Sequence, residues 1–323
     1  MLRSFLLVCA GTAALASASG ATAEVFPARP LRLIVPFPPG GPTDIVGRLV
    51  AQKLSEGLGQ QVVIDNRAGA GGTVGSEAAA RSAPDGYTLL YGSTSTLGIA
   101  PSIYPRLAYD PRTSFAPVSL VSIGPLVLAV NPAVPAKTVR ELIELARARP
   151  GKLNFASAGS GTPLHLAGEL FKMITATDIV HVPYKGGGPA VADLLAGQVQ
   201  MVFESFANLG PHIRAGKLRA LLVTSRERSP QYPDVPDIVE AGLPQFEIAF
   251  WSGLVAPAGT PPDVVNRLNA EVRRALASAE ARSTLAAQGL DAMANSPAEF
   301  ASFIAREVDQ WGRAVKASGA RAE

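Results

Sequence analysis

The residues with the clearest chemistry are backbone N–H groups, which glycine-rich turns present just before predicted helices. The first such turn, residues 36–44, reads Pro-Phe-Pro-Pro-Gly-Gly-Pro-Thr-Asp and follows a short apolar strand. Proline and glycine stop the strand, Pro42 and Thr43 begin a helix, and Gly57 or Gly59 ends it. Because the first N–H groups of a helix have no acceptor within it, this turn predicts a site for an anion.

The same combination of strand, small-residue turn and helix recurs along the chain. The further turns span residues 66–73, 92–96, 157–162 and 183–188. This rhythm is typical of parallel sheets whose carboxyl-terminal edge stays open for a ligand, so we expect Ser93, at such a strand end, near the ligand. Two units facing each other would place two sets of helix N-termini around one cleft.

Few side chains in these turns could do more than bind. The only histidines are His165, His181 and His212, and no pair has the i, i+4 spacing of a helical metal site. We expect His165, in the first turn of a helix, in the cleft, and His181 buried and hydrogen-bonded. Glu204 ends a predicted strand, where it is either a cleft carboxylate that receives a polar or cationic group or a solvated loop acid.

The motifs of common cofactor sites and hydrolases are incomplete. The run at residues 69–75 has Val74 where a dinucleotide fingerprint needs glycine, and no Gly-Lys-Ser/Thr sequence is present. Ala158 stands where a serine-hydrolase elbow needs glycine. No nucleophile–base pair accompanies the glycine turns, so we predict a binding protein with no cofactor and no metal, and not an enzyme.

Length and charge suggest a globular chain of two domains. It has 323 residues, a formal net charge of +3, 31 glycines and 27 prolines. The cations are scattered, which makes no case for nucleic acid. The apolar stretch 246–255 is a candidate strand for crossing back to the first domain. We therefore expect one domain from residues 24–123 with 243–323, and another from 124–242.

The first residues predict export. Arg3, an apolar stretch from Phe5 to Leu15 and the Ala-Thr-Ala sequence ending at Ala23 form a secretory signal over residues 1–23. Cys9 is the only cysteine, so cleavage after Ala23 would leave none for disulfides or metal. We expect a periplasmic protein.

Six separated motifs resemble the substrate-binding proteins of tripartite tricarboxylate transporters, also called Bug-type receptors. They lie at residues 36–44, 65–72, 83–87, 157–165, 182–187 and 256–261. The match covers essentially the whole mature chain. It implies an α/β two-domain periplasmic binding protein of the type II, Venus-flytrap class, each domain a mainly parallel sheet flanked by helices.

The resemblance also implies the ligand and its site. The ligand is a small carboxylate that a monomeric protein hands to an inner-membrane permease. Carried over residue by residue, the carboxylate is held mainly by backbone N–H groups and water at Phe37, Gly40, Gly41, Thr43 and Asp44, with Ala70 and Gly71 beside them. The second domain contributes Ser157, Gly159, Gly161, Thr162, His165 and Tyr184.

Three departures from the family pattern lie in the second domain. Ser160 replaces a commoner Asn, Leu164 a commoner Pro, and Glu204 a commoner Asp. These residues would read the variable end of the ligand, so the identity of the ligand stays open. Two other roles also stay open: a sensory adaptor that presents the ligand to a membrane receptor, and a periplasmic enzyme that acts on a carboxylate.

Overall fold

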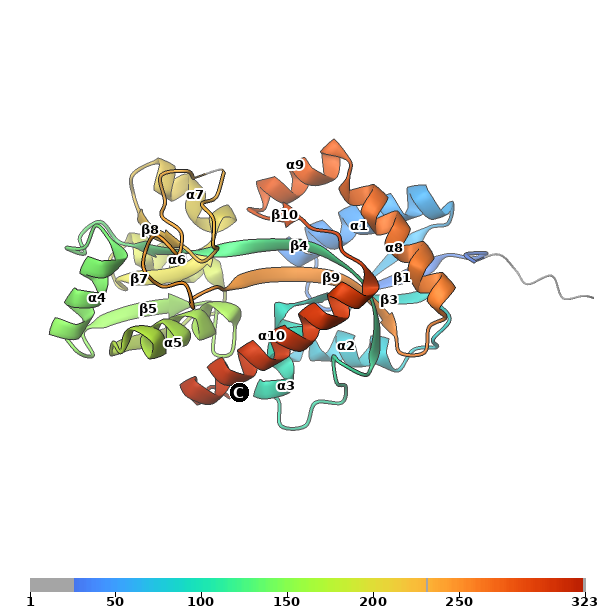
Figure 1. Cartoon of the computed structure of the whole chain (residues 1–323), viewed down its shortest axis with the longest axis horizontal. Coiled ribbons are helices and arrows are strands. Elements are labelled where there is room, and N and C mark those ends of the chain that lie inside the picture. Colours follow the sequence, from blue (N-terminus) through green and yellow to red (C-terminus); the bar gives the residue numbers. More distant parts are fainter. Residues whose placement is uncertain (1–25, 231, 322–323) are drawn as a thin grey trace, which may run out of the picture.

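A computed structural model describes residues 26–230 and 232–321. The predicted signal at residues 1–23 lies outside the described residues. The elements form two lobes joined by two long strands that run side by side, β4 (Phe115–Val130) and β9 (Ala249–Pro257) (Figure 1). Within the described ranges no helix is both long and apolar enough to cross a bilayer.

The first lobe combines the start and the end of the chain. It contains β1 (Leu31–Val35), α1 (Pro42–Leu58), β2 (Val62–Asn66), η1 (Ala70–Gly72), α2 (Thr73–Ala80), β3 (Thr88–Ser93), η2 (Thr94–Ile99), α3 (Ala100–Ile103), α8 (Pro262–Leu276), α9 (Ala279–Ala287), β10 (Asp291–Ala292) and α10 (Pro297–Ser318). The second lobe contains α4 (Val139–Ala148), β5 (Leu153–Ser157), α5 (Pro163–Thr175), β6 (Ile179–Pro183), α6 (Gly187–Leu195), β7 (Met201–Ser205), α7 (Phe206–Arg214) and β8 (Arg219–Val223).

The sheets are mixed. The strand order is β2-β1-β3-β9-β4-β7-β5-β6, with β8 and β10 also paired to β4. The outer pairs β1–β2, β1–β3, β5–β6 and β5–β7 are parallel, which confirms the predicted βαβ units. β4 and β9 pair antiparallel with each other, because they cross between the lobes in opposite directions. Their pairings with β3, β7, β8 and β10 are antiparallel as well.

The predicted strand at residues 126–130 is only the last part of β4. The preceding part carries Pro117, Ser119, Ser122 and Gly124, which interrupt the apolar run. The register against β9 shifts between Pro117 and Ser119 and again between Leu120 and Ser122. These bulges let the strand bend from one lobe to the other, at the cost of the alternation that a sequence pattern needs.

Helix α1 forms as its turn predicts. Gly41 is the N-cap, Pro42 is the first helical residue, and Gly59 ends the helix in a left-handed conformation with φ of 68°. One face of the helix, including Val46, Val50 and Leu54, is buried on the sheet. The helix N-terminus is therefore fixed at the carboxyl end of β1, where the two lobes meet.

Helix α10 ties the lobes together on the side opposite α1. It runs beneath β9 toward α5 (Figure 1), and its Trp311, Ala314 and Val315 share one buried cluster with Leu166 and Leu170 of α5. The helix occupies the residues predicted for it. Helices α7 and α9 fall where no helix was predicted, and both turn out to border the space between the lobes.

Candidate functional site

A cavity of about 260 Å³ lies between the lobes. The first lobe contributes Phe37, Pro42, Thr43 and Ser95. The second contributes Ala158, Thr162, Pro163, Leu164, Glu204 and Asn208. The crossing strands add Gly124, Pro125, Leu126 and Phe250. Of all the described residues that line this cavity, Glu204 alone has an ionisable side chain.

The start of α1 forms one wall of the cavity. Phe37, Pro42 and Thr43 line it directly, so the unpaired N–H groups of the first helical turn lie at its edge. Gly41 has φ of −79°, which any residue adopts, and the atom nearest to an added Cβ is the carbonyl oxygen of Pro38 at 3.9 Å. Gly41 therefore has open space beside it and an unstrained backbone.

Gly71 differs from Gly41. It has φ of +63°, and an added Cβ would lie 2.8 Å from the hydroxyl of Tyr104. The preceding Ala70 also has a positive φ, of 45°. The left-handed backbone that tight glycine turns require is thus present in the η1 turn and absent at Gly41. Neither Ala70 nor Gly71 is among the lining residues.

The carboxylate of Asp44 holds the first turn in place and does not face the cavity. It is 2% exposed and accepts hydrogen bonds from Gly40 N at 2.9 Å, Arg48 Nε at 2.8 Å and Asn66 Nδ2 at 2.8 Å. Burial raises its pKa, but these donors outweigh burial and hold the pKa below its ordinary value. Asn66 also donates to the carbonyl of Phe37 at 3.1 Å, so it anchors both ends of the turn.

The Ser157–Thr162 turn forms the facing wall. Ala158 and Thr162 line the cavity, and Thr162 also caps α5 by accepting from the N–H of His165. Ser157 is fully buried, and its hydroxyl contacts Nε2 of His181 at 2.6 Å. Gly159 accepts from Thr162 Oγ1 at 2.7 Å. Ser157 and Gly159 shape the turn from behind.

His165 and His181 stack behind the same turn. Their ring centroids lie 3.9 Å apart, and Nδ1 of His165 accepts from the N–H of Gly161 at 3.0 Å. Burial lowers the pKa of His165, and burial with His165 and Lys172 nearby lowers that of His181 to about 4. Two neutral rings therefore support the turn, and neither is a lining residue.

Glu204 lines the cavity from the second lobe, at the end of β7. It is 5% exposed, and its Oε1 accepts from the N–H of Ser205 at 2.7 Å. Burial raises its pKa, and hydrogen bonds from Ser205 and Asn208 oppose that shift. A Cβ on Gly187 would overlap its Oε2, so the carboxylate sits against the start of α6. No Lys, Arg or His among the described lining residues neutralises it.

Two other predicted residues lie near the cavity without lining it. Ser93 is fully buried, and its hydroxyl has no hydrogen-bond partner among the described residues. Its neighbour Ser95, in the π-helical turn η2, reaches the lining instead. Tyr184 donates to Asp193 at 2.7 Å, and burial together with Asp193 raises the pKa of Tyr184 to about 12.

The lobes touch on both rims of the cavity. On one rim, a Cβ on Gly161 would lie 2.5 Å from Cδ1 of Ile103 in α3. On the other, a Cβ on Gly289 would lie 3.1 Å from Cβ of Phe206 in α7. These approaches bring the two lobes into contact at two separate places.

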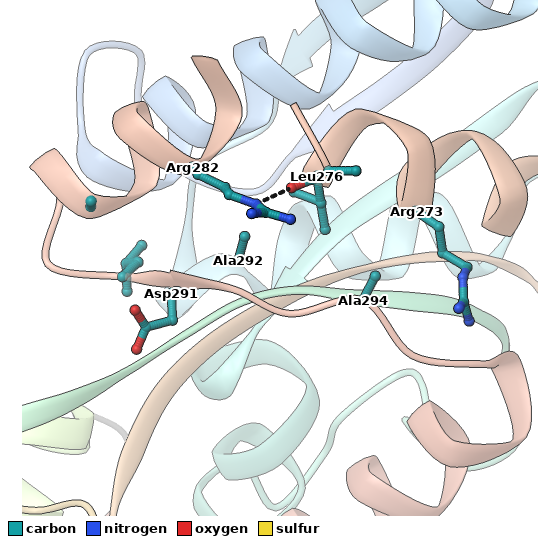
Figure 2. A pocket seen from close by; sticks show the side chains of 9 residues that line it. Arg273, Leu276, Arg282, Asp291, Ala292 and Ala294 are labelled. Atoms are coloured by element: carbon teal, nitrogen blue, oxygen red, sulfur yellow. Dashed lines mark hydrogen bonds between the residues drawn. The ribbon is translucent and has the colours of Figure 1, made fainter. Parts of the chain in front are cut away.

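A larger hollow lies elsewhere. It measures about 470 Å³ and opens between α8, α9 and β10, with Arg273, Arg282 and Asp291 in its lining (Figure 2). Arg282 donates to the carbonyl of Leu276 at 3.4 Å, and the two arginines do not converge on one point (Figure 2). None of the predicted site residues lines this hollow.

Sequence reasoning missed several lining residues. Asn208 lies in α7 and Gln288 follows α9, and neither helix was predicted. Phe250 and Pro125 come from the crossing strands, which bring distant parts of the chain together. Ser95 could have been predicted from the sequence, because it lies in the small-residue turn after the third predicted strand. Among the described residues, no group of three His, Cys, Asp or Glu side chains could hold a metal.

Comparison with known proteins finds one family model and several proteins that are similar to this chain. The family model described as "Tripartite tricarboxylate transporter family receptor" matches residues 46–320. BugT of Bordetella pertussis is 43% identical, over 94% of both chains. The structure of Rpa4515 of R. palustris with adipate is 36% identical with a TM-score of 0.79, over 92% of this chain and 99% of that chain. MatC of Rhodopseudomonas palustris, solved with malate, is 38% identical with a TM-score of 0.76, over 90% and 100%.

The agreement extends over both lobes and both crossing strands, and it gives the fold as that of an α/β periplasmic binding protein. The match with the family model alone spans far more than half of the chain. This chain therefore belongs to the tripartite tricarboxylate transporter family of periplasmic solute-binding receptors, a family of binding proteins and not of enzymes.

Proposed function

We propose that this receptor captures a small carboxylate between its lobes and delivers it to a tripartite tricarboxylate-type permease. The observation that carries the proposal is the cavity itself, which has the N-terminus of α1 on one wall and no cationic side chain in its described lining. Unpaired N–H groups and the helix dipole then have to supply the stabilisation of the carboxylate. Two relatives were solved with the carboxylates adipate and malate, which supports the same class of ligand here.

The proposal includes two domains that close on the ligand. Their boundaries, near residues 124 and 243, fall where β4 passes Gly124 and where the chain returns toward β9. The crossing strands would act as the hinge, and α10 would limit the opening because it packs on α5. Export through cleavage after Ala23 completes the proposal, and intact-mass measurement of periplasmic material tests it by a mature start at Glu24.

A thermal-shift screen of small carboxylates tests binding. A ligand at about 100 times its Kd adds roughly 2.7 kcal/mol of stability, or several degrees in Tm for a chain of this size. Calorimetry with the best ligand then compares two variants of the α1 turn. Thr43→Ala should weaken binding by about 0.5–1.5 kcal/mol for one hydrogen bond, or by about 1.5–3 kcal/mol if Thr43 bonds the charged carboxylate directly. Gly41→Val should abolish binding by filling the space beside the helix start.

Uptake of the labelled ligand tests delivery. Cells that lack the gene should lose high-affinity uptake, and the parent gene should restore it while the Gly41→Val gene does not. A folded protein that binds no carboxylate overturns the proposal. Unchanged uptake combined with loss of a transcriptional response to the ligand would replace delivery by sensing.

A further inference from the structure

Glu204 makes the two walls of the cavity chemically different. The first lobe contributes the N–H groups of the α1 turn, and the second lobe contributes a carboxylate that is 5% exposed. A dicarboxylate bound across this space would bring a second negative charge against Glu204. Like charges in a poorly solvated site repel strongly, and no described lining residue carries a compensating positive charge.

The existing partners of Glu204 do not remove this conflict. Ser205 donates its N–H to Oε1 at 2.7 Å, and Asn208 adds a side-chain hydrogen bond. Both donors are neutral, so neither supplies a positive charge that would compensate the negative charge of the Glu204 carboxylate. A carboxylate has about four acceptor positions, which leaves capacity for a donor from a ligand.

The rest of the lining restricts size and polarity. Phe37, Leu126, Leu164 and Phe250 make much of the lining apolar. The volume of about 260 Å³ lies just below the range of about 300–1,000 Å³ that is usual for small-molecule sites. The space thus fits a ligand with a short apolar body and one polar group at each end.

We infer that this receptor selects a short monocarboxylate whose far end carries an ammonium group, and that it discriminates against dicarboxylates. The inference rests on the proposed carboxylate-binding function and adds the chemistry of the second end. The ammonium donates to Glu204, and the two charges neutralise each other inside the closed cavity. Adipate and malate, the ligands of two relatives, are therefore poor ligands for this chain.

The experiment compares ligands that differ only at the far end. Glutarate, 5-aminopentanoate, 5-hydroxypentanoate and pentanoate share a five-carbon chain and one carboxylate. The same four end groups are tested on chains of three to six carbons, by calorimetry with the full-length mature protein. We expect the amino acid of the best length to bind at least tenfold tighter than the matching dicarboxylate, with the hydroxy acid between them.

Glu204→Gln removes the charge and keeps the shape of the side chain. This substitution should weaken binding of the amino acid at least tenfold and strengthen binding of the dicarboxylate, so that the difference between their affinities disappears or reverses. Glu144→Gln, at an exposed position of α4, changes the net charge equally and should leave the ranking unaltered.

Two failures have different meanings. If dicarboxylates bind the parent as tightly as the amino acids, or if Glu204→Gln leaves the ranking unchanged, the assignment of the ammonium end is overturned while the carboxylate function stands. If no carboxylate of any length binds the folded parent, the proposed function falls, and this inference falls with it.

Discussion

Trp251 and Trp311 donate their indole N–H groups to the same atom, Oε2 of Glu307, over 2.5 and 2.9 Å. Trp251 belongs to the crossing strand β9, and the other two residues belong to α10. Burial raises the pKa of Glu307, and the two indoles oppose that shift. This cluster joins the strand that connects the lobes to the helix that packs on both of them.

Removing this acceptor should destabilise the folded protein. Glu307→Ala leaves two buried N–H groups without an acceptor, at about 1–3 kcal/mol each before relaxation. We expect urea unfolding to show a loss of about 2–4 kcal/mol, and Glu307→Gln to lose less because its amide oxygen still accepts. The chain has two tryptophans, so a shift in fluorescence emission reports on this cluster.

Arg313→Ala, an exposed position of the same helix, serves as the control and should change neither stability nor emission. A Glu307→Ala protein as stable as its parent would show that the indole hydrogen bonds contribute nothing net.

Gly41 and Gly71 differ in backbone conformation, because only Gly71 has a positive φ. Gly71→Ala should cost about 1–2 kcal/mol of stability for a left-handed residue with a Cβ, and more through contact with Tyr104. Gly41→Ala should cost less than Gly71→Ala, because its φ of −79° suits alanine and only the preference of the N-cap for glycine is lost. Urea unfolding without ligand ranks the two, and equal losses would contradict the backbone account.

The two walls of the cavity differ in how well they could be predicted from the sequence. The α1 wall was predictable, because strand, turn, N-terminal proline and left-handed Gly59 are all local features. The contribution of Glu204 depended on whether β7 and its strand end faced inward. That is decided by the antiparallel pairing of Val127 with Glu204, a contact between residues far apart in the chain.

Several residues predicted for the site have side chains that lie behind the lining of the cavity. Asp44, Ser157 and His165 are buried and hold the turns through hydrogen bonds. A sequence motif records that such residues are needed but not whether they touch the ligand or position the backbone that does. Asn208 and Gln288 were missed for a different reason. Pro211 inside α7 argues against a helix there, and α9 buries only Ala281 and Leu285, which gives a weak amphipathic pattern.

The stacked histidines should lower the free energy of unfolding as the pH falls below 6.5. The pKa of His181 is about 4 in the folded protein against 6.5 ordinarily, and that of His165 is also lowered. The unfolded chain therefore binds more protons between these values, so this contribution is full above pH 6.5 and is lost as the pH falls toward 4. Lys172 opposes protonation of both rings and Glu169 favours it at His165.

His181→Gln should lower stability at pH 7.5, because the contact with Ser157 is altered, but should show a shallower decline between pH 6.5 and 5. Urea unfolding at five pH values measures both effects. Parallel curves for the parent and the variant would mean that His181 does not titrate between the folded and unfolded states.

In the ligand-free protein, Glu204 should make stability change with pH in the direction opposite to that expected for the histidines. Burial raises its folded pKa above 4.5, so the folded state keeps a proton that the unfolded chain has released. Stability from this group is present below pH 4.5 and falls as the pH rises toward the folded pKa. Glu204→Gln carries no charge at any pH, so its advantage over the parent should grow with pH and then level off.

We expect the advantage of Glu204→Gln to reach about 1–3 kcal/mol at pH 7.5, the usual range for a buried polar group short of partners, and to vanish near pH 4.5. Urea unfolding of both proteins from pH 4.5 to 8 gives the difference curve, with Glu144→Gln as the charge-matched control. The ordinary carboxylates of the protein cancel in this difference because both chains contain them. A flat curve would mean that Glu204 is as well solvated when folded as when unfolded. A variant that loses stability at every pH would mean that the hydrogen bonds from Ser205 and Asn208 outweigh the burial of the charge.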